Sequence, residues 1–301
     1  MLSPIVIVSH RRHSLPAGTS VLTLDRVIAS TLILRRVSLP EVIQDERVTK
    51  GALGVDSERT RRRIAIVLDG ESQEFVDDRA VPCRRGDCVF VPEGASHASR
   101  SGSDTVLELE WNTGALDDGA ARSSTRMKLG MRAQATARRV AEDLRTAVSG
   151  ASMVEPLTAL LSALNAEGMS FRVDAVRGLE AASPDDQSMM NGIDRILSRL
   201  HENPMLVDLE STLGQARRTL TRSIGQLHER HALLGRGGGR WRTIRDNYRL
   251  VVATILVSHE EATPRDVAGL VGYGSVEALD HALNNASLPS PLALKRAIRF
   301  A

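Results

Sequence analysis

The chain has 301 residues, of which 42% are hydrophobic and 25% charged, and its formal net charge is +2. This length suffices for two domains, and no apolar run approaches the ~20 residues of a membrane-spanning helix. The first residues, MLSPIVIVSHRRH, place an apolar stretch before the charges, the reverse of a secretory signal. The only two cysteines, Cys83 and Cys88, argue against a disulfide scaffold. We therefore expect a cytoplasmic protein with no membrane partner.

Residues 1–113 are rich in short β-type segments. VLTLDRVIASTLILRRVSL and RRRIAIVLDGESQEFV are β-branched runs broken by turn residues, and DTVLELEW alternates apolar and polar residues as a half-buried strand does. Several strands without an intervening helical pattern predict a small barrel or sandwich.

One segment of this region resembles the second motif of the cupin family. Gly86, five residues, Pro92-x-Gly94, two residues and His97 match that motif, whereas Ser101 stands where it has Asn. The first cupin motif, with its HxH and Glu, is absent, and a single His cannot supply the about three protein ligands of a catalytic metal. The resemblance implies a cupin-like barrel without a metal or other cofactor, in which His97 is structural or lines an effector site; the less favoured alternative is that His97 is a metal ligand.

Cys83 and Cys88 flank a pair of arginines, Arg84 and Arg85. Nearby Arg can lower a thiol pKa and create a redox sensor. The alternative, two small apolar residues at strand ends, is favoured because low-pKa thiols are the exception.

From residue 114 the pattern changes to helices. Residues 114–124 are small and polar, as in a linker, and helices are predicted over 131–148 and 154–164. The second helix carries an apolar stripe that needs a partner surface, either its own barrel or a second copy in a homodimer. Residues 181–190, AASPDDQSMM, have no periodic core and are interpreted as a domain linker.

Residues 206–227 predict two short helices meeting at a corner. Apolar residues at helical spacing precede and follow Gly214, a residue that can end a helix with positive φ. They are Leu206, Leu209 and Leu213 before it, and Leu220, Ile224 and Leu227 after it. The outer face of the second helix carries Arg217, Arg218, Thr219, Thr221, Arg222 and Gln226. This pattern fits a helix-turn-helix whose second helix reads the major groove; the alternative is an ordinary helical hairpin with a solvated Arg face.

Charge is unevenly distributed around this stretch. Nine arginines lie between residues 212 and 249 against Glu229 and Asp246, a balance of +7, whereas residues 250–294 hold one Arg against five acids, a balance of −4. A cationic block in a near-neutral protein is expected for a polyanion-binding protein. Within a long helix predicted over 241–257, Arg242, Arg245 and Arg249 are candidates for contacts with the DNA backbone.

The helix–corner–helix pattern then recurs. A helix begins with Thr263 as N-cap and Pro264 at its first position, a corner follows at residues 272–275, and a last helix is predicted over 276–286. Asn284, on this last helix, is a further candidate for DNA contact.

Residues 191–301 resemble the DNA-binding domain of AraC-type (AraC/XylS) transcriptional regulators. The residues that carry this resemblance are Leu209, Leu213-Gly214, Arg218-x-Leu220-x-Arg222, Asp266-Val267-Ala268, Val271-Gly272-Tyr273, Leu279, Leu283 and Ser290-Pro291. Glu210 departs from the family's core Ala, and it must reach solvent or a partner. Glu277 and Asp280 make the second reading helix acidic, so we expect the first motif to supply most DNA affinity.

The predicted fold class is α+β multidomain: a cupin-like β-barrel sensor over 1–113, a linker and helical pair over 114–182, and a double helix-turn-helix domain over 183–301. The expected function is a non-enzymatic, sequence-specific regulator, an activator by resemblance. Its partners would be promoter DNA, a small-molecule effector, a second copy and RNA polymerase. The alternatives are a degenerate regulator whose second motif binds protein, and a cupin enzyme with a helical tail.

Overall fold

A computed structural model describes residues 5–14, 20–29, 31–39, 42–45, 61–77, 79–95, 97–101, 104–112, 114–117, 126–231, 240–257 and 262–299. The glycine-rich loop at 235–239 and most of the predicted linker at 114–124 lie outside these residues. Within them, the protein is α+β, as predicted. None of the helices in the described ranges is long and apolar enough to cross a membrane.

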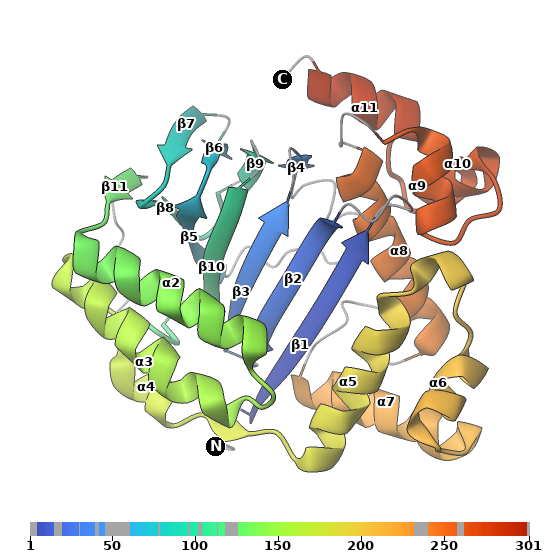
Figure 1. Cartoon of the computed structure of the whole chain (residues 1–301), viewed down its shortest axis with the longest axis horizontal. Coiled ribbons are helices and arrows are strands. Elements are labelled where there is room, and N and C mark those ends of the chain that lie inside the picture. The colour runs from blue at the N-terminus through green and yellow to red at the C-terminus, as the bar shows by residue number, and fades with distance from the viewer. Residues whose placement is uncertain are drawn as a thin grey trace.

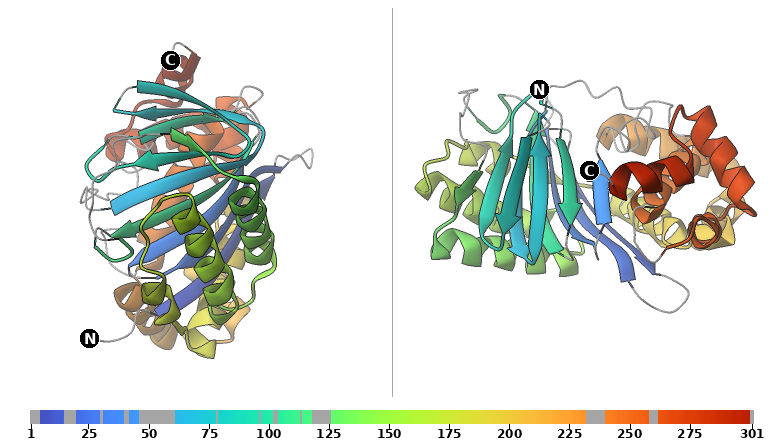
Figure 2. Two further views of the ribbon diagram at one scale, coloured as in Figure 1. Left: turned by 90° about the vertical axis from the view of Figure 1, so that its left-hand side faces the viewer. Right: turned by 90° about the horizontal axis from the view of Figure 1, so that it is seen from above.

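The strands described within residues 5–128 form two sheets, and one short strand at residues 180–181 joins the larger of them (Figures 1 and 2). The larger has the strand order β11-β8-β5-β10-β3-β2-β1-β12, and all its neighbours are antiparallel except β1 and β12. Its strands are β1 (Ile5–Ser14), β2 (Ser20–Ile28), β3 (Leu32–Leu39), β5 (Arg61–Asp69), β8 (Asp87–Val91), β10 (Asp104–Asn112), β11 (Arg126–Lys128) and β12 (Glu180–Ala181). The smaller sheet, in the order β4-β9-β6-β7, comprises β4 (Val42–Asp45), β6 (Glu71–Val76), β7 (Arg79–Arg84) and β9 (His97–Ser101).

The helical pair predicted after residue 114 is present and covers one face of the large sheet. It consists of α2 (Met131–Thr146) and α3 (Ala151–Ala166), followed by the short α4 (Val173–Arg177). Alternate residues of the strands, such as Leu107 and Leu109, share a core with Leu157 and Leu160 of α3. The apolar stripe of α3 therefore packs on its own sheet, and a homodimer stays a prediction.

The remaining helices cover the opposite face of β1, β2 and β3, so the edge of the sheet lies between two helical layers (Figure 2, right). They are α5 (Pro184–Leu197), the single 3₁₀ turn η1 (Leu200–Glu202), α6 (Leu206–Leu213), α7 (Arg217–His231), α8 (Trp241–Val257), α9 (Pro264–Leu270), α10 (Val276–Asn285) and α11 (Pro291–Arg299). One continuous core joins Ile7, Leu22 and Ile28 of the strands to Ile193 and Ile244 of the helices.

The interpretation of residues 181–190 as a linker is wrong, because α5 begins within them. The Ser183 side chain accepts a hydrogen bond from the Asp186 backbone nitrogen, and Pro184 occupies the first turn. Asp185 also lies in the first turn, where a negative charge interacts favourably with the helix dipole. The polar residues that resembled a linker are thus a helix start, and Met189, which follows them, is buried.

Gly272 holds the corner between α9 and α10 against η1. Its φ is +77°, and a Cβ added there would lie 2.2 Å from the backbone oxygen of Leu200. We expect Gly272→Ala to lower the free energy of unfolding by more than the ~1–2 kcal/mol of left-handed strain alone, since the clash adds to it. Urea denaturation measures the loss. Gly274→Ala is the matched control, because a Cβ there meets nothing within 4 Å; equal losses in both variants would contradict the prediction.

Candidate functional site

The corner between α6 and α7 has the geometry that the sequence predicts. Gly214 has φ +62°, and its backbone nitrogen donates to the Glu210 carbonyl at the end of α6. On the other side of α6, Leu213 packs so closely on α5 that a Cβ at Gly192 would lie 2.6 Å from it. The corner is therefore fixed both by its own backbone and by the helix behind it.

α7 divides sharply into a buried and an exposed face. Leu220, Ile224 and Leu227 are each 0% exposed and belong to the core beneath the sheet. The six residues predicted to read DNA are all exposed: Arg217, Arg218, Thr219, Thr221, Arg222 and Gln226. The helix thus presents one cationic, hydrogen-bonding surface, and its opposite face is buried in the core.

The arginines of this face differ in their partners. Arg217 Nε lies 2.8 Å from Glu210 Oε1, which confirms that Glu210 reaches a partner instead of entering the core. This hydrogen bond raises the pKa of Arg217. Arg218 and Arg222 have no ion pair in the described part of the chain. Their guanidinium groups are therefore available to an external anion or base edge.

The three candidate arginines of α8 divide differently. Arg242 is 88% exposed and lies 3.5 Å from Asp246. Arg245 and Arg249 are instead buried, with 8% and 5% exposure. Their burial argues against the expected contact with the DNA backbone.

Both buried arginines make contacts inside the protein. Arg245 Nη1 donates to the Pro204 carbonyl over 3.1 Å. Arg249 Nε donates to the Val271 carbonyl over 2.5 Å, and its guanidinium carbon lies 3.8 Å from the centre of the Tyr273 ring. These side chains bind the backbone ahead of α6 and after α9, so their role is structural.

The second helix–corner–helix pair begins as predicted. Thr263 caps α9, with its hydroxyl accepting from the Asp266 backbone nitrogen over 3.2 Å, and Pro264 follows in the first turn. On α10, Asn284 is exposed but its Nδ2 donates to Asp280 Oδ2 over 3.2 Å. The Asn284 amide, which was predicted to contact DNA, is therefore hydrogen-bonded to Asp280.

The segment that resembles the cupin motif forms a turn on each side of β8. Gly86 has φ +85° at the turn before β8, and the Ala95 nitrogen donates to the Pro92 carbonyl over 3.2 Å at the next turn. His97 begins β9, but its side chain lies outside the described residues, so its role in effector binding stays a prediction. Among the described residues, no three His, Cys, Asp or Glu side chains gather as a metal site would require.

The two cysteines are free and buried. Burial, followed by the nearby Glu74 and Asp87, raises the pKa of the Cys83 thiol to about 12. A raised pKa is the opposite of what a redox-sensing thiolate needs, which favours the interpretation of Cys83 as an apolar core residue.

A buried polar network that the sequence analysis missed joins the strands to the helices. Asp194 of α5, 4% exposed, accepts from Ser9 Oγ over 3.0 Å, from the His10 nitrogen over 2.8 Å and from Arg11 Nε over 2.6 Å. A further cation, Arg26 of β2, has its Nη2 4.0 Å from the same carboxylate. Ser9 and Arg11 lie more than 180 positions from Asp194 in the sequence, so no local pattern indicates these contacts.

Tyr248 of α8 extends the network along β1. The Arg11 guanidinium lies 4.2 Å from the centre of the Tyr248 ring, and His13 Nε2 lies 2.9 Å from its hydroxyl. α5 and α8 are thus both attached to the same strand through buried polar groups, in addition to the apolar core.

No protein-family model matches the chain, and no curated protein sequence matches it. Solved structures that are similar to parts of it include a protein described as glyoxylate-induced from Pseudomonas aeruginosa, with 16% identity over 36% of this chain and 41% of that one, at a TM-score of 0.29. AerE from Microcystis aeruginosa has 12% identity over 41% of this chain and 53% of its own, at a TM-score of 0.29. An RmlC-like cupin from Shewanella frigidimarina has 14% identity over 34% and 83%, at a TM-score of 0.25. The chain spans about half or less of the first two proteins, and likenesses this weak do not assign a function.

Proposed function

We propose that the protein is a sequence-specific DNA-binding transcriptional regulator that reads the major groove mainly through α7. The observation that carries this proposal is the exposed face of α7, with three arginines, two threonines and a glutamine. Arg binds guanine edges bidentately, and Thr and Gln contact bases or phosphates. The corner at Gly214 supports a helix-turn-helix arrangement, in which the first helix crosses the backbone and the second enters the groove.

The arginines of α8 and the β-rich half of the chain have supporting roles in this function. Arg242, exposed at the start of α8, is suited to a phosphate contact, whereas Arg245 and Arg249 are assigned to folding because they are buried. The β-rich half, proposed to be cupin-like, would bind a small effector or support a homodimer. An activator would in addition contact RNA polymerase.

The proposal predicts that Arg218→Ala and Arg222→Ala each weaken binding to the regulator's operator. A base-reading Arg is worth ~1–3 kcal/mol of discrimination, so each variant is expected to lose roughly 5- to 150-fold in preference for the operator over random DNA. The operator is sought in the DNA upstream of the protein's own gene and its neighbours. Fluorescence anisotropy over a salt series then measures affinity, with a log–log slope of roughly −0.9 per phosphate contacted.

Arg132→Ala is the matched control, because Arg132 is also exposed but lies on α2, across the sheet from α7. Its binding is expected to equal that of the unchanged protein. Equal, weak binding to every DNA fragment, indifferent to Arg218 and Arg222, would refute DNA reading by α7.

A further inference from the structure

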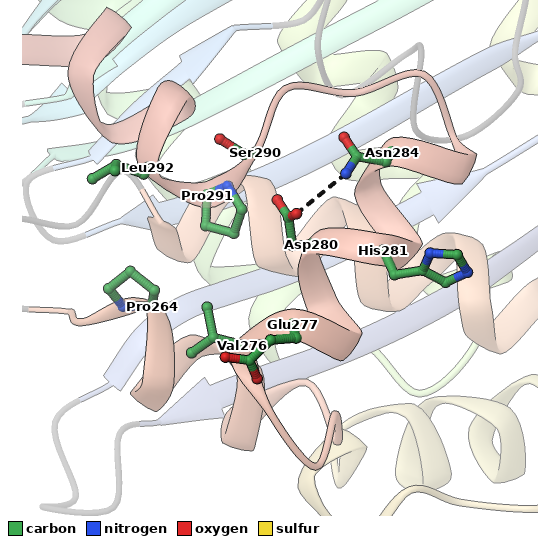
Figure 3. A pocket seen from close by; sticks show the side chains of 9 residues that line it. All are labelled: Pro264, Val276, Glu277, Asp280, His281, Asn284, Ser290, Pro291 and Leu292. Carbon is green, nitrogen blue, oxygen red and sulfur yellow. Dashed lines mark hydrogen bonds between the residues drawn. The ribbon is translucent and has the colours of Figure 1, made fainter.

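A pocket of about 430 Å³ opens beside α10, at the N-terminal ends of α9 and α11 (Figure 3). Its walls combine two kinds of residue. Pro264, Val276, Pro291 and Leu292 provide apolar surface, and Leu292 is 54% exposed although it is a large hydrophobic residue. Glu277 and Asp280 of α10 provide two carboxylates on the same pocket.

The two carboxylates are not neutralised within the pocket, because no Lys or Arg is among its lining residues. Asp280 Oδ2 accepts a hydrogen bond from Asn284 Nδ2, whereas Oδ1 is buried and has no hydrogen-bond partner among the residues that the structure describes. A buried carboxylate oxygen without a donor is costly. The Asp280 carboxylate is thus charged and only partly hydrogen-bonded within the described residues.

These walls suit a long cationic side chain. The methylene stem of an arginine packs on apolar surface while its charged head meets carboxylates. The planar guanidinium binds carboxylates through paired hydrogen bonds, which favours Arg over Lys. DNA is a poor occupant, because its phosphates are repelled by Glu277 and Asp280.

We infer that this pocket is a docking site for an arginine side chain presented by a protein partner, flanked by apolar residues that cover Leu292. α10 stands apart from α7 in Figure 1, so this surface adds a protein partner to the proposed DNA-binding face and does not depend on it. The second helix–corner–helix pair then serves protein contact, in the same chain whose first pair serves DNA.

The test uses the full-length, ¹⁵N-labelled protein and two synthetic peptides, acetyl-Gly-Leu-Arg-Leu-Gly-amide and the same peptide with citrulline in place of arginine. Citrulline keeps the shape of the side chain and removes its charge. The arginine peptide is expected to shift backbone amide signals of α10 and the start of α11 with a Kd on the order of 1 mM or tighter. The citrulline peptide is expected to bind at least about tenfold more weakly, since its hydrogen bonds to carboxylates are no longer charge-assisted.

Asp280→Asn and Glu277→Gln are each expected to raise the Kd of the arginine peptide by about tenfold. The reason is that charge-assisted hydrogen bonds are about twice as strong as neutral ones. Glu155→Gln, the same change at an exposed site on α3, is the control. Equal binding of the two peptides, no effect of the pocket variants, or shifts confined to other parts of the chain would overturn the inference.

Measurements of DNA binding on the same variants distinguish this inference from the proposed function. Arg218→Ala is expected to abolish operator preference and to leave peptide binding unchanged. Glu277→Gln is expected to leave operator affinity unchanged; a gain in DNA affinity would show that α10 faces phosphates and would overturn the assignment of the pocket to protein.

Discussion

Asp194→Ala is expected to lower the free energy of unfolding by ~3–5 kcal/mol. In the part of the chain that the structure describes, Asp194 is the acidic residue that pairs with both Arg11 and Arg26. Arg11 is 3% exposed, so water cannot replace the lost carboxylate. Removing one partner of a buried pair leaves an uncompensated buried charge, here that of Arg11. The partly exposed Arg26 loses a carboxylate 4.0 Å away as well.

The effect is expected at the junction between the strands and the helices. Asp194 lies on α5, and its partners Ser9, His10 and Arg11 lie on β1. Losing these bonds leaves the two hydrogen bonds between Gln187 of α5 and the Val8 backbone to join α5 to β1. Hydrogen exchange is therefore expected to accelerate first in α5 and β1. Urea denaturation measures the free energy of unfolding, and amide hydrogen exchange locates the opening.

Asp174→Ala is the matched control for this prediction. Asp174 also pairs with an arginine, Arg177, at 3.2 Å, but its side chain is 92% exposed. Exposed pairs contribute ~0–1 kcal/mol, so the control is expected to lose little. A loss for Asp194→Ala no larger than that of the control would mean that the buried network contributes nothing to stability.

The helices around the candidate site were largely predictable, because their signals are local. Leu220, Ile224 and Leu227 recur at the helical period, and the buried face of α7 follows from that period alone. Thr263 and Pro264 mark the start of α9 through side-chain and backbone chemistry within one turn. In each case the residues that decide the structure are neighbours in the sequence.

Two errors came from polar residues with a structural role. Ser183 and Asp185 resembled a linker by composition, although their order is that of a helix start. Arg245 and Arg249 were predicted to contact the DNA backbone because they are charged. Arg249, however, lies at helical spacing from the buried Val252, and its long side chain reaches a backbone carbonyl. A charge alone does not place an arginine on the surface when distant carbonyl groups need donors.

The attachment of the helices to the sheet could not be predicted, since it depends on pairings between distant residues. Nothing near Asp194 in the sequence indicates that it faces Arg11, and nothing near His13 indicates Tyr248. The same holds for the pocket beside α10, where the start of α11 approaches Glu277 and Asp280 only through the fold. Acidity of α10 was visible in the sequence, but the cavity was not.

His13 should make the stability of the protein depend on pH below neutrality. Burial, with smaller contributions from Arg11 and His201, lowers the pKa of His13 from 6.5 to about 4. Its neighbours in the fold are Tyr248, whose hydroxyl shares a hydrogen bond with it, and the cationic Arg11. The folded protein therefore holds His13 neutral at pH values where an unfolded chain would protonate it.

The direction in which stability changes with pH follows from the number of protons that each state binds. Below pH 6.5 the unfolded state binds the proton on His13 more readily than the folded state does, so stability falls as pH falls, until about pH 4. At pH 5 the expected loss from this residue is about 2 kcal/mol relative to pH 8, at 1.36 kcal/mol for each pKa unit. His10 acts in the opposite direction, because its pKa is raised, with Asp25 as a hydrogen-bonding partner and burial opposing the shift.

His13→Gln isolates the effect, because glutamine keeps a hydrogen-bonding group near the Tyr248 hydroxyl but does not titrate. The difference in unfolding free energy between the unchanged protein and this variant, measured by urea denaturation from pH 8 to pH 5, is expected to shift by about 2 kcal/mol in favour of the variant as the pH falls. His281→Gln, the same change at an exposed site on α10, is the control. If the His13 difference stayed constant with pH, the contact of β1 with α8 would not hold a neutral histidine, and the buried network would not confer acid sensitivity on the attachment of the helices to the sheet.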